Sequence, residues 1–222
     1  MLQIIPEKKN TKLVITLIVI FVALAVFIIF LPSILSSAGI KLVNIVTYAF
    51  ILVEYTLLLS AFLLLERYIL FKVRYVIKVN VDRLDDDGVA GEYEPLAESG
   101  NISSIPPEYL DFMIFKKTGL RGRREFRDFH MNMTTLVHLE KLKISNSSRQ
   151  YVNRLKKEYP NPHFYNYKVS FGKTDTLIAV FSAADDLTFG TVLEYSEELE
   201  AALLSLSGKL KPESVLDENT NE

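Results

Sequence analysis

The feature that most constrains this chain is a pair of long apolar runs near its start. Leu13 to Leu31 contains no charged residue, and Leu42 to Leu65 contains only Glu54. An α-helix rises about 1.5 Å per residue, so about 20 apolar residues cross the roughly 30 Å hydrocarbon layer of a bilayer. Both runs are long enough to do so. The sequence therefore predicts a transmembrane hairpin over residues 13–66, with spans over residues 13–34 and 42–65.

The basic residues beside these runs predict how the hairpin is oriented. They lie mainly on the two outer flanks: Lys8, Lys9 and Lys12 before the first run, and Arg67, Lys72, Arg74 and Lys78 after the second. The short connector carries only Lys41. Cytoplasmic flanks collect Lys and Arg, so we expect the inner (cytoplasmic) membrane, with residues 1–12 and the C-terminus both in the cytoplasm.

A cleaved signal peptide is the alternative interpretation of the first run. Lys8 to Lys12 would be its basic region, and Leu35 to Ala38 its cleavage site. The apolar core of a signal peptide is about 7–15 residues long. The first run is longer, and a second follows it closely, so the transmembrane hairpin is favoured.

Composition excludes several kinds of functional site. The chain has no cysteine, so it has no disulfide scaffold, thiolate metal site or cysteine nucleophile. His130, His138 and His163 are too scattered for metal-ligand spacing. The acidic run Asp85 to Asp87 does not match a calcium loop. No phosphate-binding loop, nucleophile elbow or dinucleotide fingerprint is present. We therefore predict no catalytic residue, metal or cofactor, and a protein that is not an enzyme.

Residues 72–210 have the pattern of a mainly β domain of the α+β class. Alternation of apolar and polar residues begins at Val73, almost directly after the second run. Further strands are expected over residues 110–117, 123–129, 133–139, 164–171, 176–182 and 187–193, with a short helix over 147–159. An acidic surface loop is expected over 83–107, and a disordered tail over 211–222.

The last element expected is an amphipathic helix that begins at Ser196. Leu199, Leu203 and Leu206 form its apolar stripe, and Gly208 is a fitting stop. Six or seven antiparallel strands followed by a C-terminal helix is the element order of a pleckstrin-homology-like (PH-like) domain. The apolar stripe would close one end of the sheet sandwich.

The chain resembles small bacterial membrane proteins in which two N-terminal spans carry a cytoplasmic PH-like domain of unknown function. The residues that carry the resemblance are the hairpin, the basic segment Lys116–Arg127, and an ending made of Tyr165–Val169, Thr176–Phe181 and Leu193–Leu199. The resemblance implies the cytoplasmic PH-like fold and supplies no catalytic residue. The acidic segment 83–107 departs from the compact pattern.

Glu54 is a candidate functional residue because of its position inside a predicted span. Insertion of a carboxylate at the centre of a membrane helix costs about 2.5–3.5 kcal/mol, so such residues usually have a role. One interpretation is a polar contact with another helix, within the hairpin or across an oligomer. The other is a proton or ion relay. The contact is favoured, because a relay usually needs a chain of ionisable groups.

The second candidate site is a cluster of bases on a predicted β-hairpin. Its members are Lys116, Lys117, Arg121, Arg123, Arg124 and Arg127. One interpretation is a solvated hairpin tip, balanced by the acidic segment before it. Another is contact with anionic lipid headgroups, to which each base near the bilayer contributes about 1 kcal/mol. Nucleic acid is disfavoured, because aromatic stacking residues do not interleave the cluster in the usual way.

These observations favour a membrane-anchored binding or scaffolding protein. Its PH-like domain would act at the inner leaflet on anionic headgroups, on a protein partner or on its own copies. The alternative is a subunit of a membrane transport or channel complex, with Glu54 inside the helix bundle.

Overall fold

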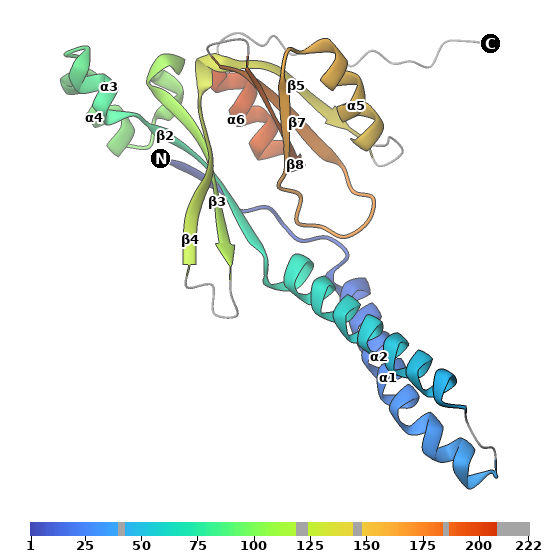
Figure 1. The fold of residues 1–222 in the computed structure, drawn as a ribbon. Helices are drawn as coiled ribbons and strands as arrows, with labels where there is room; N and C mark the ends of the chain where they lie inside the picture. Colours follow the sequence, from blue (N-terminus) through green and yellow to red (C-terminus); the bar gives the residue numbers. More distant parts are fainter. Residues whose placement is uncertain (40–42, 119–123, 144–147, 184–186, 208–222) are drawn as a thin grey trace, which may run out of the picture.

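Two long helices project from a β-rich body (Figure 1). The computed structural model describes residues 1–39, 43–118, 124–143, 148–183 and 187–207. Helix α1 spans Thr11–Ser37 and α2 spans Asn44–Leu64. The π-helix η1, Leu65–Leu70, continues α2 towards the body. The predicted tail 211–222 lies outside the described residues.

The two helices lie side by side as a hairpin, and most of their apolar side chains are exposed. Small or short side chains fill the seam between them: Val14, Ala25 and Ala61 are buried. Each helix is long and apolar enough to cross a membrane. The sequence prediction of two candidate membrane-spanning helices is therefore confirmed, and the chain is consistent with a membrane protein.

The first sheet of the body is antiparallel, in the order β1-β2-β3-β4. Its strands are β1 Leu2–Ile4, β2 Lys72–Val79, β3 Leu110–Thr118 and β4 Arg124–Asn132. Alternation places Val73, Tyr75 and Ile77 of β2 in the core. Strand β1 was not predicted from the sequence, because three residues are too few to establish a period.

The second sheet has the order β5-β7-β8-β6. Its strands are β5 Leu136–Leu142, β7 Thr176–Ser182, β8 Thr188–Glu194 and β6 Pro162–Asn166. Strand β6 is parallel to β8, so the prediction that all strands are antiparallel is wrong at this position. Helix α5, Ser148–Glu158, lies between β5 and β6 in the chain, and helical crossovers favour parallel neighbours.

The strand predicted over 164–171 is shorter than expected, because the chain leaves the sheet after Asn166. Tyr167 and Val169 turn into the core, where both are buried. The backbone N–H groups of Val169 and Ser170 then bond a carboxylate instead of a neighbouring strand. The Glu194 carboxylate therefore replaces a neighbouring strand as the hydrogen-bond acceptor, and no sequence pattern predicts this.

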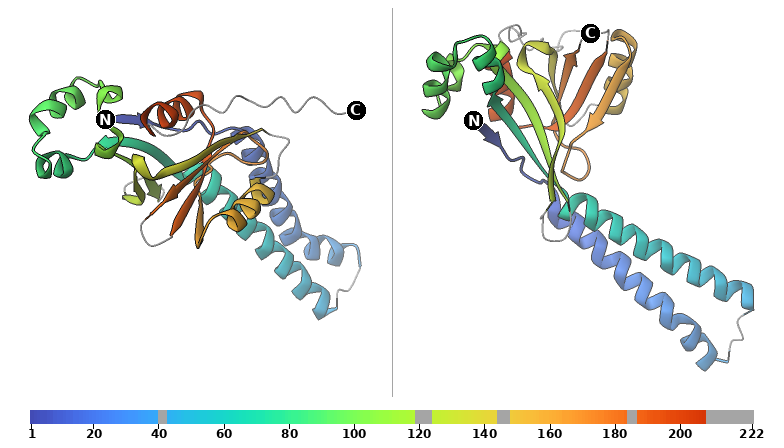
Figure 2. Two further views of the ribbon diagram at one scale, coloured as in Figure 1. Left: turned by 90° about the horizontal axis from the view of Figure 1, so that it is seen from above. Right: turned by 60° about the vertical axis from the view of Figure 1, so that its left-hand side comes forward.

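Helix α6, Glu197–Ser207, confirms the predicted amphipathic C-terminal helix. Leu199, Leu203 and Leu206 of its stripe lie in the main core, which also contains residues from both sheets. A smaller core beneath α5 includes Leu155 and Ile178. Figure 2 shows the helical hairpin extending away from the two sheets in both further views.

The acidic segment 83–107 is helical over much of its length, which corrects the expectation of a surface loop. It contains most of α3, Val81–Asp86, all of α4, Ala90–Glu98, and the 3-10 turn η2, Ile102–Ser104; η3, Pro107–Tyr109, begins at its end. The Asn80 side chain caps α3 by accepting from the Arg83 N–H at 3.2 Å. Leu84 is fully buried and fastens α3 to the body. A single buried leucine in an acidic background gives little helical periodicity.

Candidate functional site

The structure divides the predicted basic cluster into paired and unpaired bases. Arg121 and Arg123 lie outside the described residues. Lys116 forms an ion pair with Asp128 at 2.6 Å, and Lys117 lies 3.8 Å from Glu125. Arg124 and Arg127 are exposed, and no ion pair involves either of them within the described ranges. The free positive charge of this hairpin is therefore smaller than the sequence indicates.

Lys116 is a packing residue as well as a charge. It follows Phe112 and Ile114 at strand spacing, so it shares their core-facing side of β3. Its Nζ lies 5.1 Å from the centre of the Tyr167 ring. The Tyr167 hydroxyl donates to Asp128 at 2.8 Å, and burial raises the pKa of Tyr167. The alternation along β3 was the sequence signal that could have separated Lys116 from the other bases.

An exposed aromatic residue accompanies the unpaired bases. Phe126, on β4, is 45% exposed, whereas Phe112, Phe129 and Phe181 in the core are at most 6% exposed. Strand register places Phe126 opposite Lys116 on β3. We call the exposed group Lys117, Arg124, Phe126 and Arg127 the hairpin surface; the register places Arg124 and Phe126 on the face that carries Lys116, and Lys117 and Arg127 on the opposite face. It combines positive charge with an apolar ring, a composition suited to binding.

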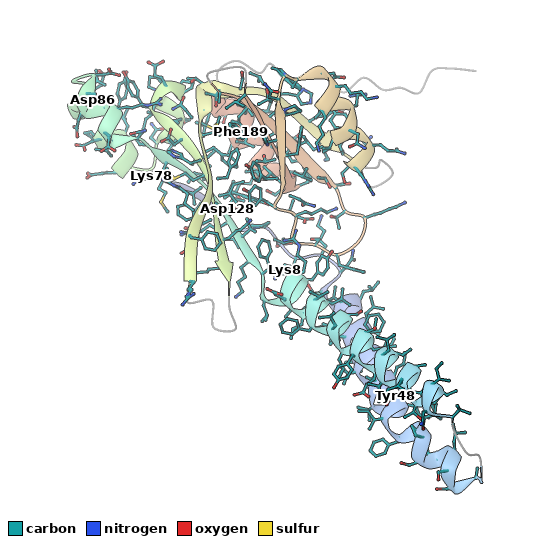
Figure 3. All side chains as sticks on the ribbon, in the orientation of Figure 1. Lys8, Tyr48, Lys78, Asp86, Asp128 and Phe189 are labelled. Atoms are coloured by element: carbon teal, nitrogen blue, oxygen red, sulfur yellow. The ribbon has the colours of Figure 1, made fainter. Side chains whose placement is uncertain are left out.

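The junction between the helical hairpin and the body is extensively bonded. We call this junction the neck; it comprises residues 7–10, 66–72 and 166–174. The Lys9 N–H donates to Ser170 Oγ at 2.8 Å, and Asn10 Nδ2 donates to the Phe171 carbonyl at 2.8 Å. Figure 3 marks Lys8 at this junction. The start of α1 is thus tied directly to the body.

The end of η1 is tied to the same segment of the body. The Tyr68 ring meets the edge of Phe171, with ring centres 5.0 Å apart. Arg67 donates through Nη2 to the Lys168 carbonyl at 3.2 Å. Both chain passages between helices and body therefore hold residues 166–174. The sheets cannot swing on a single flexible linker.

Glu194 organises the neck from within the body. Its carboxylate is buried and accepts hydrogen bonds from Val169 N at 3.3 Å, Ser170 N at 3.0 Å and Thr174 Oγ1 at 2.9 Å. Its own N–H donates to the Tyr75 hydroxyl at 3.0 Å. Burial raises the pKa of Tyr75. Sequence analysis assigned Glu194 no role, because one acid directly after the strand predicted over 187–193 carries no distinctive pattern.

Two lysines of the neck bond backbone carbonyl groups. Lys8 Nζ donates to the carbonyls of Tyr68 at 3.0 Å and Ile69 at 2.8 Å. Burial, together with the charges of Lys72 and Arg67, lowers the pKa of Lys8 to about 8. In sequence analysis these bases indicated only membrane orientation. Their contacts with the body could not be predicted from the spacing.

Lys168 is the second of these lysines. Its Nζ donates to the carbonyls of Gly172 at 3.3 Å and Thr174 at 3.2 Å. Burial lowers the pKa of Lys168; Glu194 and Asp175 oppose that shift, and Lys9 adds to it. Lys168 and Glu194 therefore both bond residues of the segment 166–174.

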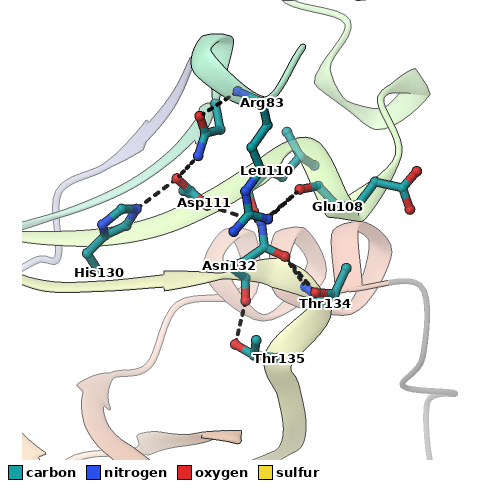
Figure 4. A network of polar contacts seen from close by, with 9 residues as sticks. Arg83, Glu108, Leu110, Asp111, His130, Asn132, Thr134 and Thr135 are labelled. Carbon is teal, nitrogen blue, oxygen red and sulfur yellow. Dashed lines mark hydrogen bonds and ion pairs between the residues drawn. The ribbon is translucent and has the colours of Figure 1, made fainter. Parts of the chain in front are cut away.

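A separate polar network fastens the far end of the first sheet (Figure 4). The buried Asp111 carboxylate accepts from Asn80 Nδ2 at 2.9 Å and Asn132 Nδ2 at 3.1 Å, and His130 Nε2 lies 2.7 Å from it. Arg83 donates to the Glu108 carbonyl at 3.0 Å. The network joins three strands to the helical insertion. Among the residues that the structure describes, no group of acids and histidines has the arrangement of a metal site.

Glu54 is half-buried on α2. In the part of the chain that the structure describes, its carboxylate has no hydrogen bond or ion pair. The hydroxyls of Thr16 and Ser60 donate to carbonyls of their own helices. The predicted interhelical contact of Glu54 is therefore not formed inside the hairpin, and a contact with another chain stays a prediction.

Comparison with protein-family models, with curated proteins and with solved structures found no match to this chain. The functional argument therefore depends on the geometry of the neck and of the hairpin surface.

Proposed function

We propose that this chain is a membrane-anchored binding or scaffolding protein whose β-rich body acts at the inner leaflet of the cytoplasmic membrane. Two candidate spans and basic flanks on both sides of them support this proposal. A body held at the ends of its spans encounters headgroups and neighbouring membrane proteins at high effective concentration.

The observation that carries the proposal is the bonded neck. It fixes the body relative to the helices, and so fixes which residues face the bilayer. The register pairs Lys72, just after η1, with Lys117 on β3, and Lys117 with Glu125 on β4. The hairpin surface therefore begins at the level where the helices end (Figure 1). We propose that it contacts anionic headgroups or a partner beside the anchor.

Two sheets with a C-terminal helix packed into the core between them support the finer proposal of a PH-like domain. The added strand β1 and the parallel strand β6 depart from that pattern. The proposed binding task depends on the hairpin surface rather than on the name of the fold, because one fold hosts many functions.

Photo-crosslinking in intact cells tests the proposal. A photoreactive phenylalanine analogue replaces Phe126 in one variant and Val137, which is 41% exposed on β5, in a control. We expect a discrete lipid or protein adduct from position 126 and none from position 137. The adduct should disappear with R124E/R127E and persist with K156E/K157E on α5. Equal labelling at both positions would argue against a binding surface.

Glu54 is half-buried and has no bonded partner among the residues that the structure describes, which favours a second candidate function, a subunit of a transport or channel complex. In that case Glu54→Gln should lower the mass of the assembly purified in mild detergent, because an intramembrane contact is lost. R124E/R127E should leave that mass unchanged. The reverse result, with Glu54→Gln silent and R124E/R127E disruptive, selects the binding function.

A further inference from the structure

We infer that the neck is a binding site for the phosphate groups of anionic phospholipids. The site is a cluster of bases from the three segments of the neck and from the first turn of α1: Lys8, Lys9, Lys12, Arg67, Lys72 and Lys168. Sequence analysis assigned lipid contact to the β3–β4 hairpin instead. This inference deepens the proposed function and rests on its claim that the helices lie in a bilayer.

The first argument is charge that remains uncompensated. Within residues 1–39, 43–118, 124–143, 148–183 and 187–207, none of the six bases forms an ion pair. Glu7 and Glu66 lie in the same segments without pairing with them. The hairpin bases Lys116 and Lys117 differ, because each faces an acid. Two of the four hairpin bases that the structure describes thus form ion pairs, whereas none of the six bases of this cluster does.

The second argument is that the bases repel one another. The hydrogen bonds to the Tyr68 and Ile69 carbonyls hold the Lys8 ammonium near Lys72 and Arg67. Burial is the largest cause of the lowered pKa of Lys8, and the charges of Lys72 and Arg67 lower it as well. Lys9 acts in the same sense on Lys168. Around Lys168 the charges of Glu194 and Asp175 oppose this effect, so the repulsion that supports the inference is the one around Lys8. An added anion would relieve the repulsion.

The third argument is position. Lys12 lies in the first turn of α1, and Lys72 follows η1 by two residues. Helices α2 and η1 together run from Asn44 to Leu70, which is about 40 Å at 1.5 Å per residue. A bilayer with its headgroups is about 40–45 Å thick. The cluster therefore lies in the headgroup layer, where the available phosphate belongs to lipid.

The cluster divides into direct ligands and supporting charges. Lys9, Lys12 and Lys72 are exposed and can reach a headgroup phosphate. Lys8 and Lys168 donate hydrogen bonds to backbone carbonyl groups. The Arg67 guanidinium lies 4.5 Å from the centre of the Phe71 ring. These three residues stabilise the neck, and their positive charges add to the attraction for an anionic headgroup.

The test is retention of lipid by the full chain from nanodiscs of mixed neutral and anionic phospholipid, counted by native mass spectrometry. We expect wild type to retain anionic lipid preferentially. K9Q/K12Q/K72Q should lower that retention about tenfold or more, because each base near an anionic surface is worth about fivefold in affinity. R149Q/K156Q/K157Q, with three bases of α5 changed, should retain lipid like wild type.

Two further arms separate the possible failures. Unchanged retention by K9Q/K12Q/K72Q would overturn the inference, and a loss confined to K117Q/R124Q/R127Q would move the lipid site to the hairpin surface. Inorganic phosphate that stabilises the detergent-solubilised chain as well as anionic lipid does would also overturn it. Cysteine accessibility in these variants reports orientation separately, because flank charges also set topology. A neck variant that keeps its orientation and loses lipid supports the inference.

Discussion

At the scale of single residues, two acids differ most in their bonding: Glu194 and Glu54. Glu194 is buried and its carboxylate has three donors. Glu54 is half-buried on a candidate span and has no bonded partner in the described part of the chain. The first acid is structural, whereas a contact of the second with another chain stays a prediction. Sequence position identified Glu54 and could not identify Glu194.

Glu194→Ala should destabilise the body by about 3 kcal/mol or more, because it leaves buried donors of the neck without an acceptor. Urea unfolding in detergent, followed by near-ultraviolet circular dichroism, measures the change. Glu194→Gln should cost less, since its amide oxygen still accepts one bond. Wild-type stability in the alanine variant would refute the role given to this carboxylate.

Gly190 is required by a close approach on β8. A Cβ at this position would lie 2.2 Å from Cε1 of the Phe164 ring, which packs against the smaller core. Gly190→Ala should therefore cost about 1–3 kcal/mol through overpacking. Gly91→Ala is the control, since Gly91 lies on α4 in open space and should gain about 0.5–1 kcal/mol. Both are measured by urea unfolding, and equal midpoints would contradict the packing argument.

At the scale of elements, hydrophobic alternation predicted most strands well. Val73, Tyr75 and Ile77 of β2, and Leu110, Phe112 and Ile114 of β3, are buried at every second position, whereas the apolar strand Thr176–Ser182 is buried on both faces. The stripe of α6 was equally clear. The sequence predictions that failed concern features set by contacts distant in the chain. Strand β1 depends on pairing with β2, and the direction of β6 depends on the crossover through α5. The helices in 81–98 depend on a cap and one buried leucine.

Strand β1 can be tested by a pair of neighbouring isoleucines. Ile4 is 5% exposed and Ile5 is 67% exposed. Ile4→Ala should destabilise the body by about 2–4 kcal/mol, because it empties a core position. Ile5→Ala should change the unfolding midpoint little. Similar effects of the two substitutions would show that β1 contributes nothing to the first sheet.

At the scale of the whole molecule, the neck joins three stretches that no sequence pattern associates: residues 7–10, 66–72 and 166–174. The bases of the candidate hairpin site could be listed from sequence, but their pairing could not. Lys116 and Asp128 approach only because a bulge between Ile114 and Phe115 shifts the register of β3 and β4. The neck contacts depend on the assembled fold in the same way.

The stability of the neck should depend on pH through Lys8. We call the neck closed when Lys8 bonds the Tyr68 and Ile69 carbonyls, and open when these bonds are broken and Lys8 is exposed to solvent. Its pKa is about 8 in the closed neck, against an ordinary value of 10.5. Between these values the open neck binds more protons, so the closed form gains stability as pH rises from about 8 to 10. Spin labels at Tyr48→Cys and Lys156→Cys, in a chain without native cysteine, measure the closed fraction in nanodiscs. Lys8→Gln should weaken the pH dependence, and a closed fraction that falls over this window would contradict the account.

The most direct test of the central claim is labelling of single cysteines in intact cells with a membrane-impermeant maleimide. Ser36→Cys lies at the far end of α1 and Lys156→Cys lies on α5 of the body; both positions are exposed. We predict that position 36 reacts in intact cells and that position 156 reacts only after permeabilisation. Reaction of position 156 in intact cells, with position 36 protected, would place the body outside the cytoplasm and contradict the proposed membrane-anchored role at the inner leaflet.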